Sequence, residues 1–489
     1  REVKLADVQR VASQRLVADN RTLATYIPTE KPLRAPAPQR MDMAQAMREF
    51  KPAQAAGRVE AFEATPANID ARTQRFEVGG IRAALVPKGT RGQAVRAVLT
   101  LRFGNVDSLA GLGDVPDFTA ALLDKGTATM TREQVQDRLD QLKTELSFRA
   151  STGQLSVSIA SRREHLPAAI ALVGELLRKP AFPADAFDEI RRQALTGIEQ
   201  QRKEPGSVAD NALGRLGNPY PRGDVRYERT FDEMVTDVNT VTLEQVRDFH
   251  ARFYGAARGE FAAAGDMDAA QVRTALQAAL GDWRGAAPYT RVPQPFVAPV
   301  PQRLVLSTPD KQNATMLVQL PVPLSDRDAD YPALTMANYL LGLGGNSRLW
   351  KRIRETEGLS YDVNSRVSWN SHEAHSIWTA SAIFAPQNGP KVEKAFREEL
   401  ERVLREGFSA QELAEGQRGL LNFRRLSRAQ DGGIAATLAN NLNLDRSFAY
   451  SARIDAELSR LTLAQVNAAL RKYLKPQSLV FVLAGDFKP

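Results

Sequence analysis

The strongest constraint in this sequence is a pattern of one helix and one strand that occurs three times along the chain. Each copy begins with a short amphipathic segment, which reads LADVQ at 5–9, LEQVR at 243–247 and LAQVN at 463–467. An apolar, strand-like segment follows each of them, and the copies are roughly 220 to 240 residues apart. A repeat of this length indicates duplicated domains rather than a short-period solenoid, because each unit is large enough to bury its own core.

Two whole domains and the tail of a third are therefore predicted. A second repeated block supports this count, because 176–189 and 403–415 share an amphipathic helix, a Pro or Gly stop, an aromatic residue and a helix with an acidic first turn. We place the predicted boundaries at 1–28 for the C-terminal helix and strand of a preceding domain, 29–64 for a linker rich in Pro, Ala and Gly, and 65–290 and 300–489 for the two complete domains.

Strands and helices are segregated inside each domain. Apolar residues fall at every second position in 79–85 and 95–103, as on strands with one buried face, whereas 165–178 and 183–203 have helical periodicity. Segregation of this kind favours the α+β class, with two homologous domains that each have an antiparallel sheet covered by helices. The second domain repeats the order, with strands at 303–306 and 315–320 and helices near 331–341 and 347–357.

Composition excludes several classes of protein. The chain has 489 residues, 43% of them hydrophobic, and no cysteine, which removes disulfides, thiolate metal sites and cysteine nucleophiles. Its net charge of +8 comes from scattered arginines rather than from a basic block interleaved with aromatic residues, so no nucleic-acid partner is predicted. No apolar run reaches the roughly 18–20 residues that span a bilayer, so no membrane span is predicted. Arg1 and the lack of a visible signal peptide are typical of a processed chain or a fragment.

One segment resembles a known family. Residues 344–349 read Gly-Gly-Asn-Ser-Arg-Leu, and 354–361 read Arg-Glu-Thr-Glu-Gly-Leu-Ser-Tyr. Together with the two similar domains in tandem, this phrase resembles the pitrilysin family of zinc metallopeptidases, which includes insulin-degrading enzyme and mitochondrial processing peptidase. The resemblance covers the whole chain and implies that it corresponds to the inactive C-terminal half of such a peptidase.

The chain departs from the family at the position of the metal site. Active members carry H-x-x-E-H, in which two histidines bind Zn²⁺, the glutamate is the general base, and a glutamate further along completes the site. In the matching stretch Asp117 and Ala121 occupy the histidine positions and Ala120 that of the base. Alanine can neither coordinate a metal nor accept a proton, so the resemblance implies a degenerate site without a metal. Glu199, near the position of the distant ligand, is then an ordinary helix-surface residue.

The four histidines offer no clear replacement site. Only His372 and His375 are close in sequence, in H-E-x-H, which is one residue short of the H-E-x-x-H that places two imidazoles on one helix face. The surrounding segment is strand-rich, so the two side chains are expected on opposite faces. A structural or turn role is favoured over a metal site, and the chain alone is not expected to hydrolyse peptides.

Arg354 and Tyr361 are the candidate functional residues. The resemblance implies that they project into the chamber of the peptidase, bind the substrate near the scissile bond and support the developing oxyanion at the partner's zinc site. Such donors are needed because the tetrahedral intermediate carries negative charge, and a guanidinium is always charged. The alternative is structural, with an i,i+3 ion pair between Arg354 and Glu357 and a tyrosine in the core.

Gly344 and Gly345 have two interpretations. Their spacing fits neither the P-loop nor the dinucleotide-binding motif, so nucleotide binding is not expected. A helix C-cap and turn explains them without a ligand. The resemblance offers a substrate-contacting loop instead, because inactive subunits of processing peptidases carry a glycine-rich loop in this region.

The predicted function is that of a catalytically silent half of a pitrilysin-like zinc endopeptidase, which forms one wall of a chamber for unfolded peptides. The expected partners are a zinc-bearing homologous half, in the same precursor or as a heterodimer, and a peptide substrate. No cofactor is expected in this chain, and zinc is expected in the partner. The alternative is a non-enzymatic assembly subunit of the same fold. A periplasmic location is favoured over a cytoplasmic one.

Overall fold

The computed structural model describes residues 4–25, 60–285 and 287–487. The chain divides into two units, Arg1–Gln54 and Ala55–Pro489, and each is described by itself. In the described ranges, no helix combines the length and the apolar character that crossing a membrane requires.

The first unit contains the amphipathic helix α1 (Leu5–Arg15) and the short 3₁₀ helix η1 (Ala18–Asn20). The sequence predicts a strand at 23–27, but residues 23–25 are not in a strand, and the rest of that segment lies outside the described residues. The predicted linker at 29–64 also lies outside them, except for its last five residues.

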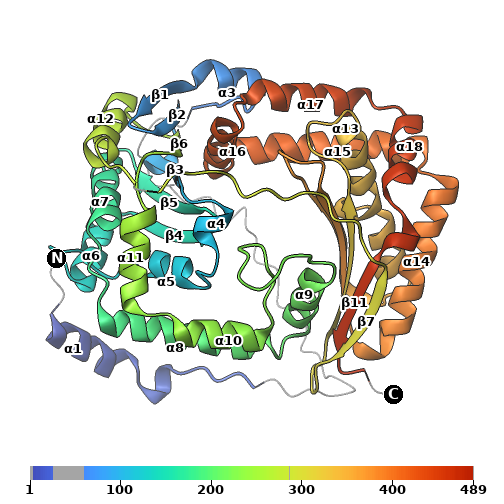
Figure 1. The fold of residues 1–489 in the computed structure, drawn as a ribbon, viewed down its shortest axis with the longest axis horizontal. Helices are drawn as coiled ribbons and strands as arrows, with labels where there is room; N and C mark the ends of the chain where they lie inside the picture. The colour runs from blue at the N-terminus through green and yellow to red at the C-terminus, as the bar shows by residue number, and fades with distance from the viewer. Residues whose placement is uncertain (1–3, 26–59, 286, 488–489) are drawn as a thin grey trace. The chain divides into compact units, whose positions relative to one another are not determined.

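The second unit consists of two lobes, each built on one sheet (Figure 1). The first lobe contains α3 (Pro66–Arg72), β1 (Gln74–Val78), β2 (Ile81–Pro87), η2 (Arg91–Gln93), β3 (Ala94–Arg102), α4 (Val106–Leu109), α5 (Val115–Leu122), α6 (Arg132–Gln141), β4 (Glu145–Ser151), β5 (Gln154–Arg162), α7 (Leu166–Arg178), α8 (Ala184–Gln201), α9 (Pro205–Arg215), α10 (Phe231–Thr240), α11 (Leu243–Phe253), β6 (Gly259–Gly265) and α12 (Ala269–Leu280). The second lobe contains β7 (Gln302–Ser307), β8 (Ala314–Val322), α13 (Tyr331–Asn338), η3 (Tyr339–Leu343), η4 (Trp350–Thr356), β9 (Ser360–Ser368), β10 (Ser376–Phe384), η5 (Pro386–Asn388), α14 (Gly389–Glu406), α15 (Ala410–Ala429), α16 (Asp431–Asn443), α17 (Phe448–Arg460), α18 (Leu463–Tyr473), η6 (Pro476–Ser478) and β11 (Val480–Gly485).

The two sheets have equivalent strand orders, apart from the additional edge strand β1 in the first sheet. The first is β1-β2-β6-β3-β5-β4 and the second β7-β11-β8-β10-β9, so the last strand of each lobe lies between the first and second strands of the repeat. These last strands pair parallel with β2 and β7, and the remaining neighbours are antiparallel. The α+β class predicted from the sequence is confirmed, and the parallel pair in each sheet is an addition to the predicted antiparallel arrangement.

The repeated sequence pattern has a local physical cause. In both lobes it reads Thr-Leu-x-Gln, and the threonine caps the helix that precedes the last strand. Thr242 accepts a hydrogen bond from the backbone of Gln245, whose side chain accepts one from the backbone of Thr242, and the same reciprocal bonds begin α18. This capping box satisfies two N–H groups that a helix end otherwise leaves unpaired. It begins α11 and α18 at equivalent leucines, Leu243 and Leu463.

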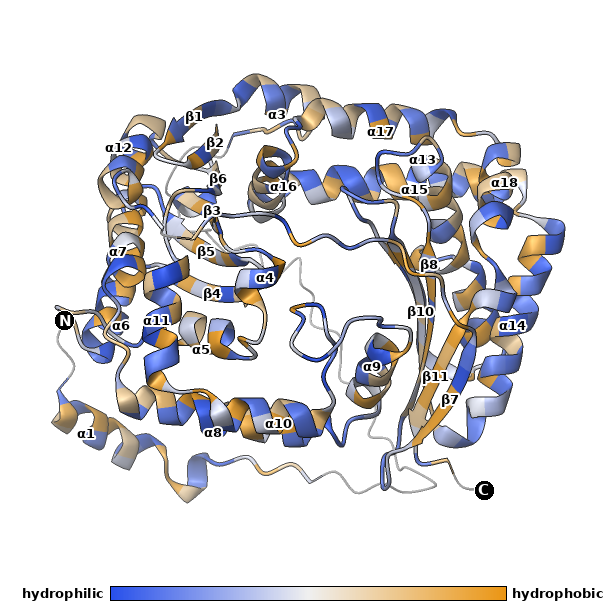
Figure 2. Ribbon diagram, in the orientation of Figure 1, coloured by the Kyte–Doolittle hydropathy of each residue, from blue (hydrophilic) through white to orange (hydrophobic). Residues whose placement is uncertain are grey.

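The lobes exchange helices. α16 of the second lobe packs on β2, β3 and β6 of the first sheet, and α9 of the first lobe packs on β8 and β11 of the second sheet (Figure 1). Each sheet already carries helices of its own lobe on the other face, so β6 and β11 are buried along their whole lengths. Figure 2 shows β11 as hydrophobic over most of its length, as a strand covered on both faces must be.

Polar contacts support the same interface. The Asp70 carboxylate in α3 accepts hydrogen bonds from the backbone N–H groups of Phe448 and Ala449 at 3.0 and 2.8 Å, and from the Ser447 hydroxyl at 2.7 Å. A carboxylate of the first lobe thus occupies the N-terminus of α17, where the helix dipole favours negative charge. A charged pair with little solvent exposure, Lys88 with Asp431 at 2.6 Å, joins β2 to the start of α16.

We predict that shortening a buried side chain on either exchanged helix destabilises both lobes together. Leu438 of α16 and Leu213 of α9 are buried against the sheet of the opposite lobe, so Leu438→Ala and Leu213→Ala should each lower the free energy of unfolding by about 2–5 kcal/mol. Denaturant unfolding followed by circular dichroism and by tryptophan fluorescence checks this. Both probes should report one shifted transition, and Val305→Ala, at a half-exposed position, should change little. Two separate transitions would contradict the interlocked arrangement.

Candidate functional site

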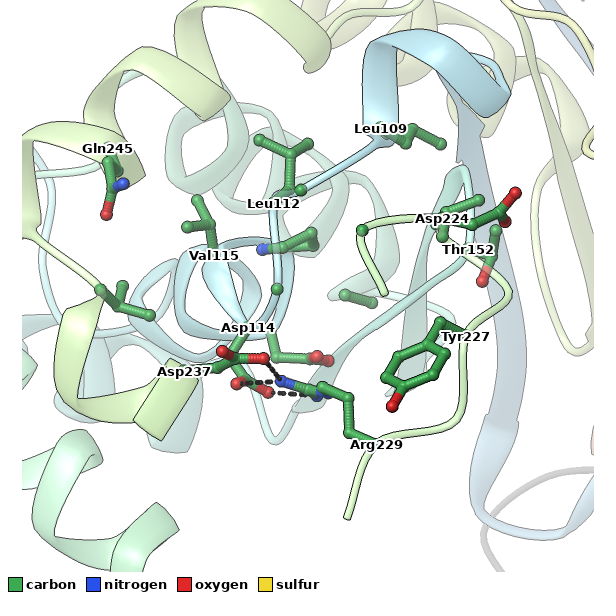
Figure 3. A pocket seen from close by; sticks show the side chains of 18 of the residues that line it. Leu109, Leu112, Asp114, Val115, Thr152, Asp224, Tyr227, Arg229, Asp237 and Gln245 are labelled. Atoms are coloured by element: carbon green, nitrogen blue, oxygen red, sulfur yellow. Dashed lines mark hydrogen bonds and ion pairs between the residues drawn. The ribbon is translucent and has the colours of Figure 1, made fainter. Parts of the chain in front are cut away.

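A large pocket in the first lobe lies at the position where the family resemblance predicts a degenerate metal site. Its volume is about 750 Å³, and Asp117 at the start of α5 lines it together with the loop before α5, the β4–β5 turn and the segment before α10. Figure 3 shows the pocket and most of its polar side chains. The residues that carry its charge are Asp114, Asp117, Arg222, Asp224, Arg229 and Asp237.

One arginine bridges two of these acids. Arg229 donates two hydrogen bonds to the Asp114 carboxylate, at 2.6 and 2.9 Å, and one to Asp237 at 3.1 Å (Figure 3). The bidentate pair raises the pKa of the Arg229 guanidinium, so this group stays charged. Arg222 also donates a hydrogen bond to Asp237 at 2.8 Å, so two guanidinium groups balance the two acids and neither carboxylate is left free to bind a cation.

Asp117 is the acid without such a partner. Asp117 is an exposed residue, but it lines the pocket, where the surrounding protein removes part of the hydration of its carboxylate. This loss of hydration raises the pKa of Asp117 to about 6, with a smaller contribution from the neighbouring charge of Asp114, while Arg229 acts in the opposite direction. The carboxyl group is thus poised to titrate near neutral pH without taking part in a hydrogen bond among the described residues.

The other residues at this position do not fit a zinc ion. Ala120 is buried in the hydrophobic core of the first lobe, and neither it nor Ala121 lines the pocket. Throughout the described part of the chain, no group of three His, Asp or Glu side chains is placed to hold a metal. Glu199 lies exposed on α8, where its carboxylate lies 3.5 Å from Arg202. The donor set is incompatible with zinc, so we derive no metal-dependent step for this chain.

The histidines are in structural positions. His372 and His375 lie in the loop between β9 and β10, rather than in a strand as predicted. Nδ1 of His375 is 3.1 Å from the carbonyl oxygen of Gln294, and its ring packs against Phe296. His250 is enclosed in the first lobe, where burial lowers its pKa and Nε2 lies 2.7 Å from the carbonyl oxygen of Leu177.

The second lobe brings Arg354 and Tyr361 together. Arg354 lies in the π-helix η4, and its guanidinium donates a hydrogen bond to the backbone oxygen of Tyr361 at 2.5 Å. The guanidinium carbon is 4.2 Å from the ring centre of Trp350 and 5.2 Å from that of Tyr361. Two aromatic faces thus hold the charged group through cation–π contacts at the surface.

The structural alternative for this pair is wrong. Glu357 pairs with Arg352 instead of Arg354, and Arg354 makes no ion pair with a carboxylate among the described residues. Tyr361, at the start of the edge strand β9, is 77% exposed and is not a core residue. Arg354 and Tyr361 therefore present an unneutralised guanidinium and a phenol to the solvent.

Gly344 and Gly345 lie in a different place. The N–H of Gly344 donates to the carbonyl oxygen of Tyr339 at 2.8 Å, so Gly344 ends the π-helix η3 and begins a turn, as a helix C-cap does. Both glycines line a small pocket against α15. They belong to the same lobe as Arg354, whereas Asp117 belongs to the other lobe.

Comparison with known proteins supports the architecture. Residues 240–420 match the protein family described as "Peptidase M16 inactive domain". A "non-peptidase homolog", YmxG of Helicobacter pylori, is 21% identical over 374 residues, which covers 76% of this chain and 84% of that protein. An uncharacterized zinc protease of Mycobacterium tuberculosis is 25% identical over 380 residues, with the same two coverages.

Solved structures share the fold. A peptidase M16 inactive domain from Pseudomonas fluorescens has a TM-score of 0.72 and 22% identity, over 84% of this chain and 97% of that one. The periplasmic protease PqqL from Escherichia coli has a TM-score of 0.66 and 14% identity, and the match covers 99% of this chain but 50% of PqqL.

The second unit has the two-lobed fold of the solved M16 inactive domains, and residues 240–420 match the family model of that name. The predicted resemblance to the pitrilysin-like family is thereby confirmed.

Two features of these sites were missed in the sequence. Trp350 stands four residues before Arg354, a spacing that places both on one side of a helix and could have indicated their contact. The contact between Arg229 and Asp114 joins residues more than 100 positions apart, and no local pattern marks it.

We predict that Asp117→Asn stabilises the protein at neutral pH. The pKa of Asp117 is raised above its ordinary value of about 3.9, so folding opposes its ionisation, and stability is lost as pH rises from about 4 to 6. The variant should melt at a higher temperature than the parent above about pH 6, and the difference should vanish below about pH 4. Thermal unfolding between pH 3.5 and 8 measures this.

Asp137→Asn is the matched control, because Asp137 is exposed on α6. Its melting temperature should follow that of the parent at every pH. A gain from Asp117→Asn that is equally large at pH 3.5 would refute the titration of Asp117 as the cause.

Proposed function

We propose that this chain is the catalytically silent half of a zinc endopeptidase and supplies Arg354 and Tyr361 to an active site on a zinc-bearing homologous half. The observation that carries the proposal is the arrangement of Arg354, whose guanidinium is held between two aromatic rings and has no carboxylate partner among the described residues. Ala120 and Ala121 cannot bind zinc, and Asp117 belongs to no metal-binding group among the described residues, which supports placing the zinc in the partner half.

The chemistry suits a peptide substrate. A tetrahedral intermediate at the partner's zinc carries negative charge on oxygen, and a preorganised donor stabilises that charge more strongly than it does the ground state. Arg354 offers a permanently charged donor, and its aromatic neighbours limit its rotamers. The Tyr361 hydroxyl adds a neutral donor beside it. The chain itself is proposed to hold no zinc, so elemental analysis should find the metal only in the complex.

A second candidate is a non-enzymatic assembly subunit. The name of the Helicobacter pylori relative, a non-peptidase homolog, favours it. The two candidates differ in one observation, which is whether a half with H-x-x-E-H is encoded upstream in the same reading frame or in an adjacent one. The similarity to a periplasmic protease is the basis for proposing a periplasmic location.

We predict that Arg354→Ala and Tyr361→Phe lower the turnover of the reconstituted peptidase. Each substitution removes a donor that acts on the transition state, so kcat should fall roughly 10- to 1000-fold with little change in KM. Steady-state kinetics on a fluorogenic peptide, with the purified zinc-bearing half added in excess, measures both constants.

Arg352→Ala is the control from the same π-helix. Arg352 pairs with Glu357 and, at 3.0 Å, with Glu398, so it lacks the free guanidinium that the proposal requires. Its loss should leave kcat within about twofold of the parent. Unchanged turnover in both Arg354→Ala and Tyr361→Phe would return the pair to a structural role.

The helix α1 is the proposed contact with the partner half. It has the same length as α11 and α18 and begins at an equivalent leucine. Val8 of α1 is 55% exposed, whereas its counterparts Val246 and Val466 are 0% exposed. In the two lobes this helix packs on its own domain and leads into the last strand of the sheet. We therefore propose that α1 and the residues after it complete a domain of the same fold in the zinc-bearing half.

We predict that Val8→Asp combined with Val11→Asp, or deletion of residues 1–28, weakens binding of the zinc-bearing half at least about tenfold, because buried charge or loss of the apolar face removes the contact. Analytical ultracentrifugation or calorimetry measures the affinity. Ser13→Asp is the control, since the counterparts Ala251 and Arg471 are exposed. Full affinity of the deletion variant would rule out this role for α1.

A further inference from the structure

The pocket of the first lobe has the size and the lining of a small-molecule site. Its volume of about 750 Å³ lies in the range of ligand pockets, which are mostly apolar and contain a few polar groups that orient the ligand. Leu112, Val115 and Val241 contribute apolar walls (Figure 3). The function proposed above makes no use of this pocket.

Arginines balance three of the four aspartates that line the pocket. Asp114 and Asp237 are bonded by arginines as described above. Asp224 accepts two hydrogen bonds from the guanidinium of Arg226, at 2.9 and 2.7 Å. Asp117 is exposed and takes part in no ion pair or side-chain hydrogen bond among the described residues. The free charge of the pocket is therefore the carboxylate of Asp117.

The groups around this carboxylate offer it no counter-charge. Asp114, in the loop before α5, repels it. Arg229, in the segment before α10, attracts it, but two other carboxylates already bind that guanidinium. The phenol of Tyr254, which follows α11, stays neutral at physiological pH because burial raises its pKa. An ionised Asp117 thus lacks a partner within the protein.

A guanidinium group fits this arrangement better than other cations do. A metal ion needs several ligands, and no group of three His, Asp or Glu side chains in the described part of the chain is placed to supply them. An ammonium group has three donors, but the carboxylate oxygens of the other aspartates are already bonded to arginines. A planar guanidinium forms two parallel hydrogen bonds with one carboxylate, so Asp117 alone is sufficient for it.

We propose that the pocket of the first lobe binds the guanidinium group of an organic cation, with its charge paired to Asp117 and its apolar part against Leu112, Val115 and Val241. A free small molecule and the arginine side chain of a polypeptide both present this group. Binding requires neither zinc nor a partner half, so the inference is independent of the proposed function. A bound cation also offsets the cost of ionising Asp117 in the folded protein.

The test is isothermal titration calorimetry on the isolated full chain at neutral pH. Butylguanidinium is compared with its neutral isostere butylurea, and the blocked tripeptide acetyl-Leu-Arg-Leu-amide with the same peptide carrying citrulline in place of arginine. Each guanidinium compound that binds should do so at least about tenfold more tightly than its neutral isostere, which lacks the charged hydrogen bonds. Binding of butylguanidinium alone identifies a small molecule as the source, whereas binding of the tripeptide with equal or higher affinity identifies an arginine side chain.

Variants assign the preference to Asp117. Asp117→Asn, confirmed as folded by circular dichroism, should remove the preference for guanidinium, and the exposed control Asp137→Asn should preserve it. In the parent protein the affinity for the guanidinium compound should rise between about pH 5 and pH 7, because the pKa of Asp117 is about 6 and only the ionised carboxylate pairs with the cation. The Asp117→Asn variant should show no such rise.

Three results would overturn the proposal: no saturable binding of either guanidinium compound, equal affinity for the neutral isosteres, or a preference that survives Asp117→Asn. None of these measurements involves turnover. Failure here therefore leaves the kcat prediction for Arg354→Ala untouched, and the two proposals can fail separately.

Discussion

The rest of the second unit depends on one constraint, which is that both faces of each sheet must be covered. β6 and β11 are buried from end to end, and neither lobe has enough helices of its own on the second face. The exchange of α9 and α16 provides the missing cover. Small residues make the contact close, because Ala262 and Ala264 of β6 pack against Ile434 and Leu438 of α16. Each lobe therefore stabilises the other, and the sites on both lobes lie on a fixed framework.

Charge compensation explains how the pocket of the first lobe accommodates several acidic side chains. A cluster of acids without a cation would repel itself in an enclosed pocket. Arg229 reaches Asp114 from the segment before α10 and provides a compensating positive charge. Asp117 makes no ion pair among the described residues, and loss of hydration, more than the charge of Asp114, raises its pKa.

Much of the fold could be predicted from the periodicity of the sequence. The rest of the fold and the geometry of the sites depend on contacts between residues that are distant in sequence. The Thr-Leu-x-Gln capping box is local, so the repeat and the helices that it begins were visible in the sequence. The parallel pairing of β6 with β2 was not visible in the sequence, because the apolar residues of a buried strand do not determine which strand pairs with it. Likewise the sequence predicted two functional residues at Arg354 and Tyr361, but an ion pair between Arg354 and Glu357 was equally compatible with their spacing. The structure decides between these two interpretations, because Glu357 forms its ion pair with Arg352 rather than with Arg354.

The geometry at Arg354 follows from an irregular helix. η3 and η4 are both π-helices, and they flank the turn at Gly344 and Gly345. A π-turn widens the helix, and such turns occur frequently at functional sites. η4 ends at Thr356, and Gly358 follows it with a φ of +61°, the left-handed conformation that glycine adopts without strain; β9 begins two residues after Gly358. The chain reverses so sharply that Arg354 reaches the backbone oxygen of Tyr361. The guanidinium is thus held by the backbone oxygen of Tyr361 and by two aromatic rings, and it needs no carboxylate to hold it.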